Sequence, residues 1–544
     1  MVLKNGKIIS MDSRNRIFEA VAAKDGKIVA VTSNKGIARF IGENTRVIDL
    51  AGKTVTPGLI DTHSHLALAG VDMMFIPDLA RPEVKRVKEV LDIVRERASQ
   101  LKKGEWITVR NFEEQYLDEK RSVTRSELDS ISPEHPVAVF CEDGHRLIVN
   151  SLALQLAGVT ADTPDLEGFI VKDQNGQLTG LLRESAMGYV TVKIPPWTVE
   201  QLEEGIKAAQ EEWIKVGLSA NKDPGLFEPS HRMIQAYRNL HAKGQLKVRS
   251  DVLWLTHEAA DIDCASAEFR GPADDMLKIG GIKIFLDGAM RIRTAWMHDE
   301  FNVDYNRVDT GNRGYPVIDL ELFKNLVLEA HKRGLQICIH AIGDRAVDTA
   351  LDAIEQALKK APRKDHRHTL IHAEVPTRQA LRRMKSLRVA VETQTVFLHS
   401  MDDLAGNLGP KRAKRAMPMK SYMKLGITVG NGADADFYPL APSTGLYSAC
   451  TRRPRKEPFG PKVFGTSECL TVREALKTYT TLAAKCLFWE DRIGSIEPGK
   501  CADFVVWSED LYSVPAEKLK DVEAEMTIIG GIVHKAKDSS RLSP

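Results

Sequence analysis

Eight short apolar runs, separated in most cases by helical segments, constrain the fold more than any other feature of this sequence. They occupy residues 55–63, 218–223, 249–255, 279–286, 335–340, 369–373, 388–394 and 427–433. Helical patterns lie between most of them, for example over 199–216 and 346–360. Strands that alternate with helices form parallel sheets, and eight such units are what a TIM (β/α)8 barrel requires. The pattern therefore predicts an α/β fold built on that barrel.

The two ends of the chain have a different pattern. Residues 2–50 contain short alternating runs broken by Asn5-Gly6 and Asp25-Gly26, which are strong signals for β-hairpin turns. The tail resumes this style around 501–507 and 526–533. We therefore expect β-structure at both ends, outside the barrel.

A long interval separates the first strand candidate from the second. It runs from Leu66 to Trp197, about 130 residues against ~30 for an ordinary β/α unit. The interval predicts an inserted domain. Because the insertion leaves the carboxyl end of the first strand, where barrels keep their active sites, we interpret it as a lid or substrate-selecting cover. A stabilising surface domain is the alternative interpretation.

Polar residues recur at or near the carboxyl ends of the apolar runs. In chain order they are His63, His65, Lys283, His340, His372 and Asp434. Side chains of a strand alternate faces, so His63 and His65 would point the same way, close enough to hold one ion. Lys283 sits in a β-branched run, where an unpaired ammonium would be costly. One buried histidine is more often a hydrogen-bonded core residue, but six such residues at strand ends indicate a metal site.

Several longer stretches carry a family resemblance, and they extend from about Asn5 to Val533. They read PGLIDTHSH, GIKIFLDGAM, IHAIGDRAVDTALDAIE, HTLIHAEV, GADADFYPLAP and GSIEPGKCADFVVW. With them the chain resembles the amidohydrolase superfamily of metal-dependent hydrolases, and within it the family 3 branch that includes N-substituted formamide deformylase-like proteins. The resemblance implies that both chain ends join in one small β-sandwich beside the barrel.

Pattern and resemblance together give an expected domain organisation. We expect the β-sandwich to comprise residues 1–54 and 486–544 and the first barrel strand to comprise 55–65. The inserted lid or substrate domain would cover 66–197, and the rest of the catalytic barrel 198–485.

The resemblance also implies two metal ions. His63 and His65, with the carboxylate of Asp434, would hold one divalent ion, and His340 with His372 would hold a second. Neutral imidazole and carboxylate suit zinc or a similar borderline cation. His368 precedes the run that His372 ends, so it would lie at the strand's start, away from the catalytic end.

Lysine carboxylation is a further implication. In the superfamily a lysine on the fourth strand is often carboxylated by carbon dioxide to a carbamate that bridges two metals, and Lys283 stands at that place. Alternatively, Lys283 would reach solvent or pair with Asp287. Lys222, at the end of the second strand, is a rival for the bridge. Asp436 stands where the family commonly has proline, and a second carboxylate there could alter metal affinity or substrate choice.

The implied reaction is metal-assisted hydrolysis of a non-peptide C–N bond in linear amides, formamides or cyclic amides. Bound metal lowers the pKa of water from ~15.7 to about 7, and Asp434 would take that proton and return it to the leaving amine. His145 and Glu184, in stretches of the insertion that resemble the same branch, are our candidates for substrate contact. A mononuclear deaminase, a lactone or ester hydrolase, and a non-catalytic binding protein are the alternatives.

Composition narrows the partners and the compartment. Lys and Arg number 76 against 74 Asp and Glu, a formal charge of +2, and there is no basic block typical of nucleic-acid binding. No run approaches the ~18–20 apolar residues of a membrane span, and the start lacks the apolar core of a signal peptide. Seven cysteines form no C-x-x-C pair, so neither a disulfide framework nor a zinc ribbon is indicated. We expect a cytoplasmic enzyme acting on a small molecule; the sequence allows a homo-oligomer without determining it.

Overall fold

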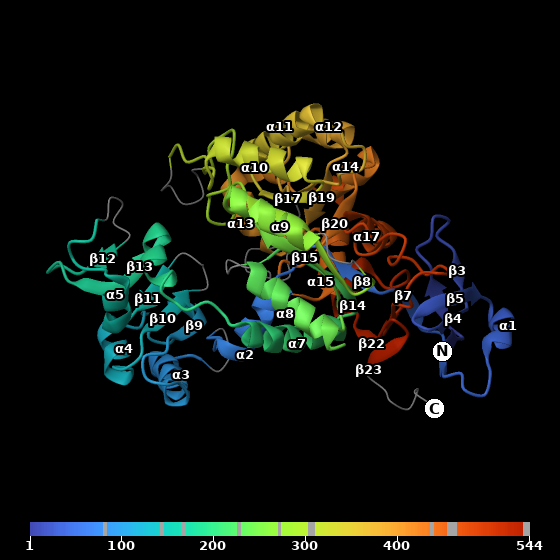
Figure 1. The fold of residues 1–544 in the computed structure, drawn as a ribbon, viewed down its shortest axis with the longest axis horizontal. Helices are drawn as coiled ribbons and strands as arrows, with labels where there is room; N and C mark the ends of the chain where they lie inside the picture. Colours follow the sequence, from blue (N-terminus) through green and yellow to red (C-terminus); the bar gives the residue numbers. More distant parts are fainter. Residues whose placement is uncertain are drawn as a thin grey trace. The chain divides into compact units, whose positions relative to one another are not determined.

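The computed structural model of the chain divides into two compact units (Figure 1). One comprises Gly70–Gly205 and the other comprises Met1–Ala69 with Ile206–Pro544. The structure describes residues 1–79, 84–141, 146–164, 170–225, 230–269, 274–302, 310–435, 440–453 and 465–536.

An eight-stranded parallel sheet forms the centre of the larger unit. In sheet order its strands are β8 (Leu59–Asp61), β14 (Leu218–Asp223), β15 (Arg249–Leu255), β16 (Leu277–Phe285), β17 (Gln336–Ala341), β18 (Thr369–His372), β19 (Ala390–Thr393) and β20 (Val429–Asn431). The backbone N–H of Thr62 donates to the carbonyl of Asn431 at 3.1 Å, so the last strand lies against the end of the first. The sheet is thus a nearly closed barrel, and the predicted (β/α)8 fold is confirmed.

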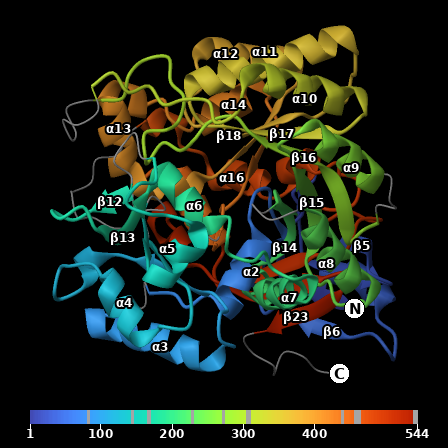
Figure 2. The same ribbon diagram turned by 60° about the vertical axis from the view of Figure 1, so that its left-hand side comes forward.

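Helices cover the outside of this barrel (Figures 1 and 2). They include α8 (Ser230–Ala242), α9 (Ala259–Phe269), α10 (Leu320–Lys332), α11 (Asp344–Lys360), α12 (Arg378–Leu387) and α14 (Met419–Leu425). In α11 the buried residues recur at helical spacing, from Ala346 to Ala357, which places one apolar stripe against the sheet. This helix and α7 (Val199–Lys215) match the two helical stretches expected from the sequence.

The expected first strand, 55–63, is two strands in different sheets. β7 (Thr54–Pro57) pairs with strands of the chain ends, and β8 of the barrel begins only at Leu59. Gly58 joins them, and a Cβ at this position would collide with the side chain of Ser219. Only glycine lets the chain pass this closely from one sheet to the other. A continuous apolar run in the sequence does not reveal that break.

Strands from both ends of the chain form two packed sheets. The four-stranded sheet has the order β5 (Lys27–Thr32), β4 (Ala20–Lys24), β1 (Val2–Lys4) and β6 (Val47–Asp49). The six-stranded sheet has the order β23 (Ile532–Ala536), β22 (Ala524–Ile529), β21 (Phe504–Trp507), β7, β2 (Lys7–Ile9) and β3 (Ile17–Phe18). Leu3 and Val21 of the first sheet share a buried core with Ile8, Phe504 and Ile528 of the second. The β-sandwich built from both chain ends is therefore present.

The two predicted hairpin turns have different outcomes. Asp25 and Gly26 both have positive φ, 51° and 74°, and join the antiparallel strands β4 and β5 in a two-residue hairpin. The prediction for Asn5-Gly6 is wrong, because β1 and β2 on either side of it belong to different sheets. There the chain crosses between the layers of the sandwich instead of turning back on itself.

The smaller unit folds around its own sheet. The strand order is β12 (Ile170–Lys172), β13 (Leu178–Arg183), β11 (Arg146–Val149), β10 (Val137–Cys141) and β9 (Ile107–Phe112). Val139 and Ile148 belong to one apolar cluster, with residues of α3 (Val87–Gln100) and α4 (Arg125–Ile131). Ala138 and Leu147, their neighbours along the strands, belong to a second cluster with α5 (Ser151–Ala157). Alternate residues thus bury both faces of this sheet.

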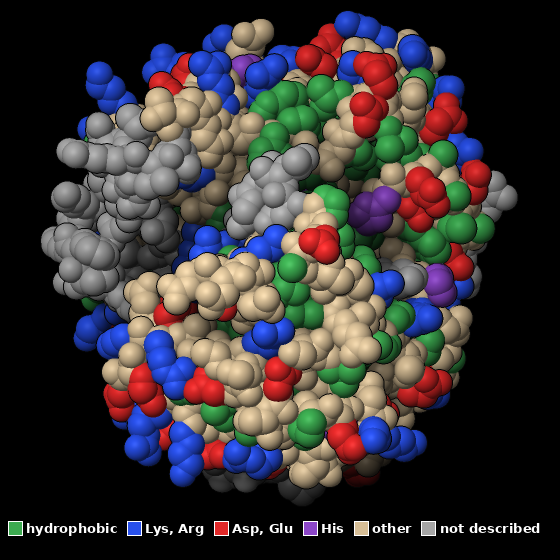
Figure 3. Space-filling view, turned by 90° about the vertical axis from the view of Figure 1, so that its left-hand side faces the viewer, with side chains coloured by type: hydrophobic (Ala, Val, Ile, Leu, Met, Phe, Trp, Pro, Cys, Tyr) green, Lys and Arg blue, Asp and Glu red, His purple; other side chains and the backbone are tan. Residues whose placement is uncertain are grey.

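The surface carries charges of both signs. Lys and Arg side chains are interspersed with Asp and Glu over the face drawn in Figure 3, which agrees with the formal charge of +2. Among the described residues, no helix combines the length and the apolar character needed to cross a membrane.

Candidate metal centre

Three predicted ligands converge at the carboxyl end of the barrel. His63 and His65 follow β8, and Asp434 follows β20. The Nε2 atoms of His63 and His65 each lie 3.4 Å from Oδ1 of Asp434. Two ligand atoms ~2.1 Å from one ion and this far apart subtend an angle of about 110°, which is close to tetrahedral. The chemistry and spacing of these atoms therefore fit one divalent ion.

These histidines lie in a loop rather than on the face of a strand, contrary to the expectation. β8 stops at Asp61, whose carboxylate accepts the backbone N–H groups of His63 at 2.9 Å and Ala433 at 3.0 Å. Asp434 has a positive φ of 55°, a conformation found at functional positions. His65 Nδ1 lies 2.9 Å from the carbonyl of Gly225, so it donates there and leaves the Nε2 lone pair for an ion.

A second pair of ligands lies beside the first group. Nδ1 of His340 and Nε2 of His372 are 3.1 Å apart, and the ring centres of His63 and His372 are 5.2 Å apart. The other nitrogens face acceptors: His340 Nε2 lies 3.0 Å from the Gly288 carbonyl, and His372 Nδ1 lies 2.7 Å from Gln394 Oε1. Two ligands ~2.1 Å from one ion and 3.1 Å apart subtend about 95°. This pair can therefore also hold an ion.

Lys283 is buried on β16, with 1 % of its surface exposed. Within the described part of the chain, its Nζ makes no hydrogen bond or ion pair and lies 4.7 Å from the ring centre of Phe285. Neither alternative for this lysine is found. It does not reach solvent, and the Asp287 carboxylate instead accepts backbone N–H groups of Trp296, Ile342 and Gly343.

Electrostatics in the cluster suit metal ligands. Burial, reinforced by the charge of Lys283, lowers the pKa of His63 and of His340 to about 3. Burial alone would raise the pKa of Asp434, but the histidines around it hold that pKa well below its usual value. Burial lowers the pKa of Lys283 to about 8. The His63 and His340 imidazoles are therefore neutral and the Asp434 carboxylate is ionised, which are the forms that bind metals.

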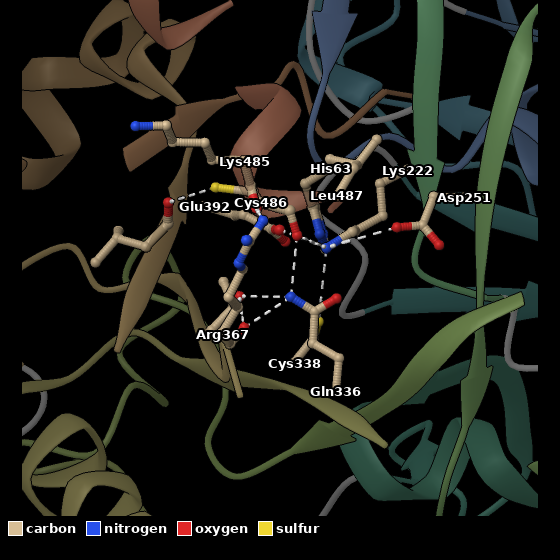
Figure 4. A network of polar contacts seen from close by, with 12 residues as sticks. His63, Lys222, Asp251, Gln336, Cys338, Arg367, Glu392, Lys485, Cys486 and Leu487 are labelled. Atoms are coloured by element: carbon tan, nitrogen blue, oxygen red, sulfur yellow. Dashed lines mark hydrogen bonds and ion pairs between the residues drawn. The ribbon is translucent and has the colours of Figure 1, made fainter. Parts of the chain in front are cut away.

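Lys222 belongs to a different environment (Figure 4). Its Nζ donates to Glu392 Oε1 at 2.6 Å and to the carbonyl of Cys486 at 3.4 Å, and it lies 4.0 Å from Asp251 Oδ2. Burial would lower the pKa of Lys222, but the neighbouring Cys338, Glu392 and Asp251 raise it above its ordinary value. This lysine is therefore a charged partner in a buried ion pair.

Two buried polar residues at the catalytic end were missed by the sequence analysis. Glu374 is 4 % exposed, and burial, with the charges of Asp287 and Asp434, raises its pKa to about 8. Gln394 is fully buried beside His372. Glu374 follows the apolar run 369–373, and Gln394 ends the run 388–394. Their position at strand ends, the signal that indicated the histidines, could therefore have identified both.

The remaining predicted residues are not described. His145 and Asp436 lie outside the described residues, as does the side chain of Glu184, whose backbone begins the short helix η3 (Glu184–Met187). Their proposed roles stay predictions.

Known proteins of similar sequence and structure agree on one family. The profile of the Amidohydrolase family matches residues 46–534. The "Putative amidohydrolase YtcJ" of Bacillus subtilis is 32% identical over 97% of each chain. The N-substituted formamide deformylase of Arthrobacter pascens is 25% identical over 99% of each chain. The crystal structure of an uncharacterized metal-dependent hydrolase from Pyrococcus horikoshii superposes with a TM-score of 0.78, at 25% identity, over 95% of this chain and 98% of that one.

Proposed function

Since the chain belongs to the amidohydrolase family, whose members include metal-dependent hydrolases, we propose that it hydrolyses a non-peptide C–N bond of a small amide. The observation that carries this proposal is the convergence of His63, His65 and Asp434, with His340 and His372 beside them. The Arthrobacter relative is named for the hydrolysis of N-substituted formamides, so formamides and other linear or cyclic amides are the substrates to test first.

We propose two divalent ions, with zinc the best match to four imidazoles and a carboxylate. The two ligand groups support this number, because each spans an angle suited to a separate ion. For the anionic bridge between the two ions we propose Lys283 as a carbamate; its burial on β16 without a charged partner among the described residues supports this choice. Its neutral amine would add to carbon dioxide, forming an N–C bond and releasing one proton.

Charge favours Lys283 over Lys222 for that modification. Only an uncharged amine attacks carbon dioxide, and the lowered pKa of Lys283 makes its neutral form accessible near pH 8. Lys222 is held as an ammonium by Glu392 and Asp251. The ion pair thus removes Lys222 from competition.

Asp434 is the group we propose for proton transfer. A divalent ion bound here would lower the pKa of a water molecule to about 7 and polarise a substrate carbonyl. The Asp434 carboxylate is ionised, so it can accept a proton from the attacking water. It would then return the proton to the amide nitrogen, which leaves poorly as an anion. The Nε2 atoms of His63 and His65 lie 3.4 Å from Asp434 Oδ1, so an ion held by these two imidazoles would also hold the Asp434 carboxylate in place.

For the inserted segment we propose the role of a substrate-selecting cover. This proposal is supported by the point of insertion, directly after the loop that carries His63 and His65. Changing His145 or Glu184 to alanine should alter KM or substrate preference while metal content stays unchanged. Loss of metal in either variant would instead identify that residue as a ligand.

The central experiment is hydrolysis of a panel of N-alkylformamides, linear amides, hydantoins and lactones before and after chelation and reconstitution with Zn²⁺. We expect amide hydrolysis that is lost on chelation and restored by metal. Lys283→Ala should lower metal content and activity, with partial recovery when a short carboxylic acid replaces the carbamate. Absence of metal-dependent hydrolysis across the panel, or full metal occupancy and unchanged turnover in Lys283→Ala, would contradict the proposal.

A further inference from the structure

Gln394, one residue past β19, is the side chain that orients His372. Its Oε1 lies 2.7 Å from His372 Nδ1, and the side chain is fully buried. The partner histidine, His340, is oriented differently, because its Nε2 faces the backbone carbonyl of Gly288 at 3.0 Å. The protonation pattern of the pair therefore depends on one replaceable side chain and one main-chain group.

His340 Nδ1 and His372 Nε2, which face each other, can either share a hydrogen bond or bind one cation together. The Gly288 carbonyl requires a proton on His340 Nε2, which leaves a lone pair on Nδ1. If His372 carried its proton on Nε2, that N–H would donate to His340 Nδ1, 3.1 Å away, and close the site. If the proton sits on Nδ1 of His372, two lone pairs face each other and only a cation joins them. A neutral imidazole has one N–H, so each use excludes the other.

We propose that Gln394 is a positioning residue that selects the metal-binding tautomer of His372. An amide oxygen accepts hydrogen bonds and cannot donate, so Oε1 stabilises the Nδ1–H form and leaves the Nε2 lone pair for an ion. Phe397 stacks on the His372 ring at 5.7 Å between centres, which restrains the plane of the ring but not the position of its proton. The inference rests on the proposed binuclear centre, and it identifies the residue that sets the tautomer of His372, a ligand of the second ion.

The experiment is metal titration of the chelated, full-length protein with Zn²⁺ alone. We expect two ions per wild-type chain. Gln394→Leu should keep one ion and bind the second roughly 10–100-fold more weakly, the usual effect of removing such a partner. Gln394→Glu keeps an acceptor at the same place and should retain the second ion.

A matched control separates this role from simple loss of a buried amide. Gln336 is equally buried, but its Nε2 donates to the carbonyls of Arg367 and Cys486 in the network of Figure 4. Gln336→Leu should leave both ions bound with wild-type affinity. If Gln336→Leu weakens the second ion as much as Gln394→Leu does, the positioning role is contradicted.

A second readout needs no variant at Gln394. In metal-free wild-type protein with ¹⁵N-labelled histidine, the signal lost in His372→Asn should report a proton on Nδ1. A proton on Nε2 would overturn the inference. Unchanged binding of both ions in folded Gln394→Leu would also overturn it while leaving the proposed function intact. A wild-type chain that binds one ion or none would instead contradict the binuclear centre.

Discussion

At the residue scale, a chain of three histidines lies at the amino-terminal end of β18, where it takes no part in the metal centre. His368 Nε2 lies 2.8 Å from His331 Nδ1, and His331 Nε2 lies 2.6 Å from the Ala361 carbonyl. His366 Nε2 faces the Leu387 carbonyl at 2.8 Å, and its Nδ1 accepts the backbone N–H of His368 at 2.9 Å. His368 Nδ1 accepts the backbone N–H of Ile337 at 3.1 Å, so each ring uses one nitrogen as donor and one as acceptor, which is the hydrogen-bonding pattern of a neutral imidazole.

This arrangement predicts sensitivity to acid. Burial lowers the pKa of His366 and of His368 below the ordinary value of 6.5. The unfolded chain therefore binds more protons, and stability that is complete above pH 6.5 is lost as the pH falls below it. The loss approaches ~1.4 kcal/mol per pH unit for each histidine. Urea unfolding measures the free energy of unfolding at pH 7.5 and at pH 5.5. The loss between these two values should be smaller for His366→Asn than for wild type, because asparagine keeps an acceptor in place of Nδ1 but has no imidazole to protonate. Equal losses in variant and wild type would count against this account.

A second prediction at this scale concerns Asp434. Asp434→Asn should lower kcat on amides by at least ~10²-fold, the scale of general acid–base catalysis. An activated ester, whose leaving group needs no proton, should be affected less. Metal content measured on the same samples is the control, because loss of the ion would depress both substrates alike. Equal loss on both substrates at full metal content would exclude Asp434 as the proton donor.

At the element scale, barrel strands and one short helix meet in a buried layer of charge. Lys278 of β16 lies 3.4 Å from Asp251 of β15, and Lys222 of β14 pairs with Glu392 of β19. Lys278 also donates to the Leu487 carbonyl at 2.7 Å, and Lys222 to that of Cys486. These carbonyls lie at the carboxyl end of α17 (Thr481–Cys486), where the helix dipole stabilises cations. The two cations and two anions of this layer balance one another.

This layer predicts strong coupling between Lys222 and Glu392. Glu392→Leu should cost about 3–5 kcal/mol of unfolding free energy, because it leaves a buried ammonium without its partner. The double variant Lys222→Met/Glu392→Leu should lose far less than the sum of the single variants. A double-mutant cycle by urea unfolding measures the difference. Additive effects would show that the pair contributes no coupling.

At the scale of the whole molecule, the two units have separate apolar cores. The clusters of the smaller unit draw on residues between Leu79 and Val190, and the predicted ligands all belong to the larger unit. Metal binding stabilises the folded state of the unit that contains the site.

Calorimetry of the full chain should therefore resolve two transitions. Chelation should lower the melting temperature of one and leave the other within ~1 °C, because a ligand stabilises only the cooperative unit that binds it. Reconstitution with Zn²⁺ is the control and should restore the first transition. A single transition that moves as a whole on chelation would show that the units unfold together.

Much of this protein follows from the sequence alone. Periodicity and strand-end position are local properties, so they predicted the barrel strands, the β-structure at both chain ends and the candidate ligands. The joining of the two ends in one sandwich came from the family resemblance. The ends of the strands are less visible: the break at Gly58 depends on how closely Ser219 approaches, and that contact joins distant segments.

Only the tertiary structure decided between chemically equal residues. Lys222 and Lys283 both stand in apolar strands, but Glu392, 170 positions from Lys222 in the chain, pairs with Lys222 and leaves Lys283 without an ion-pair partner among the described residues. Gln394 likewise acquires its role from His372, 22 positions away. Protonation and charge depend on burial and on the nearest partner in space, and folding sets both through contacts that no local pattern records.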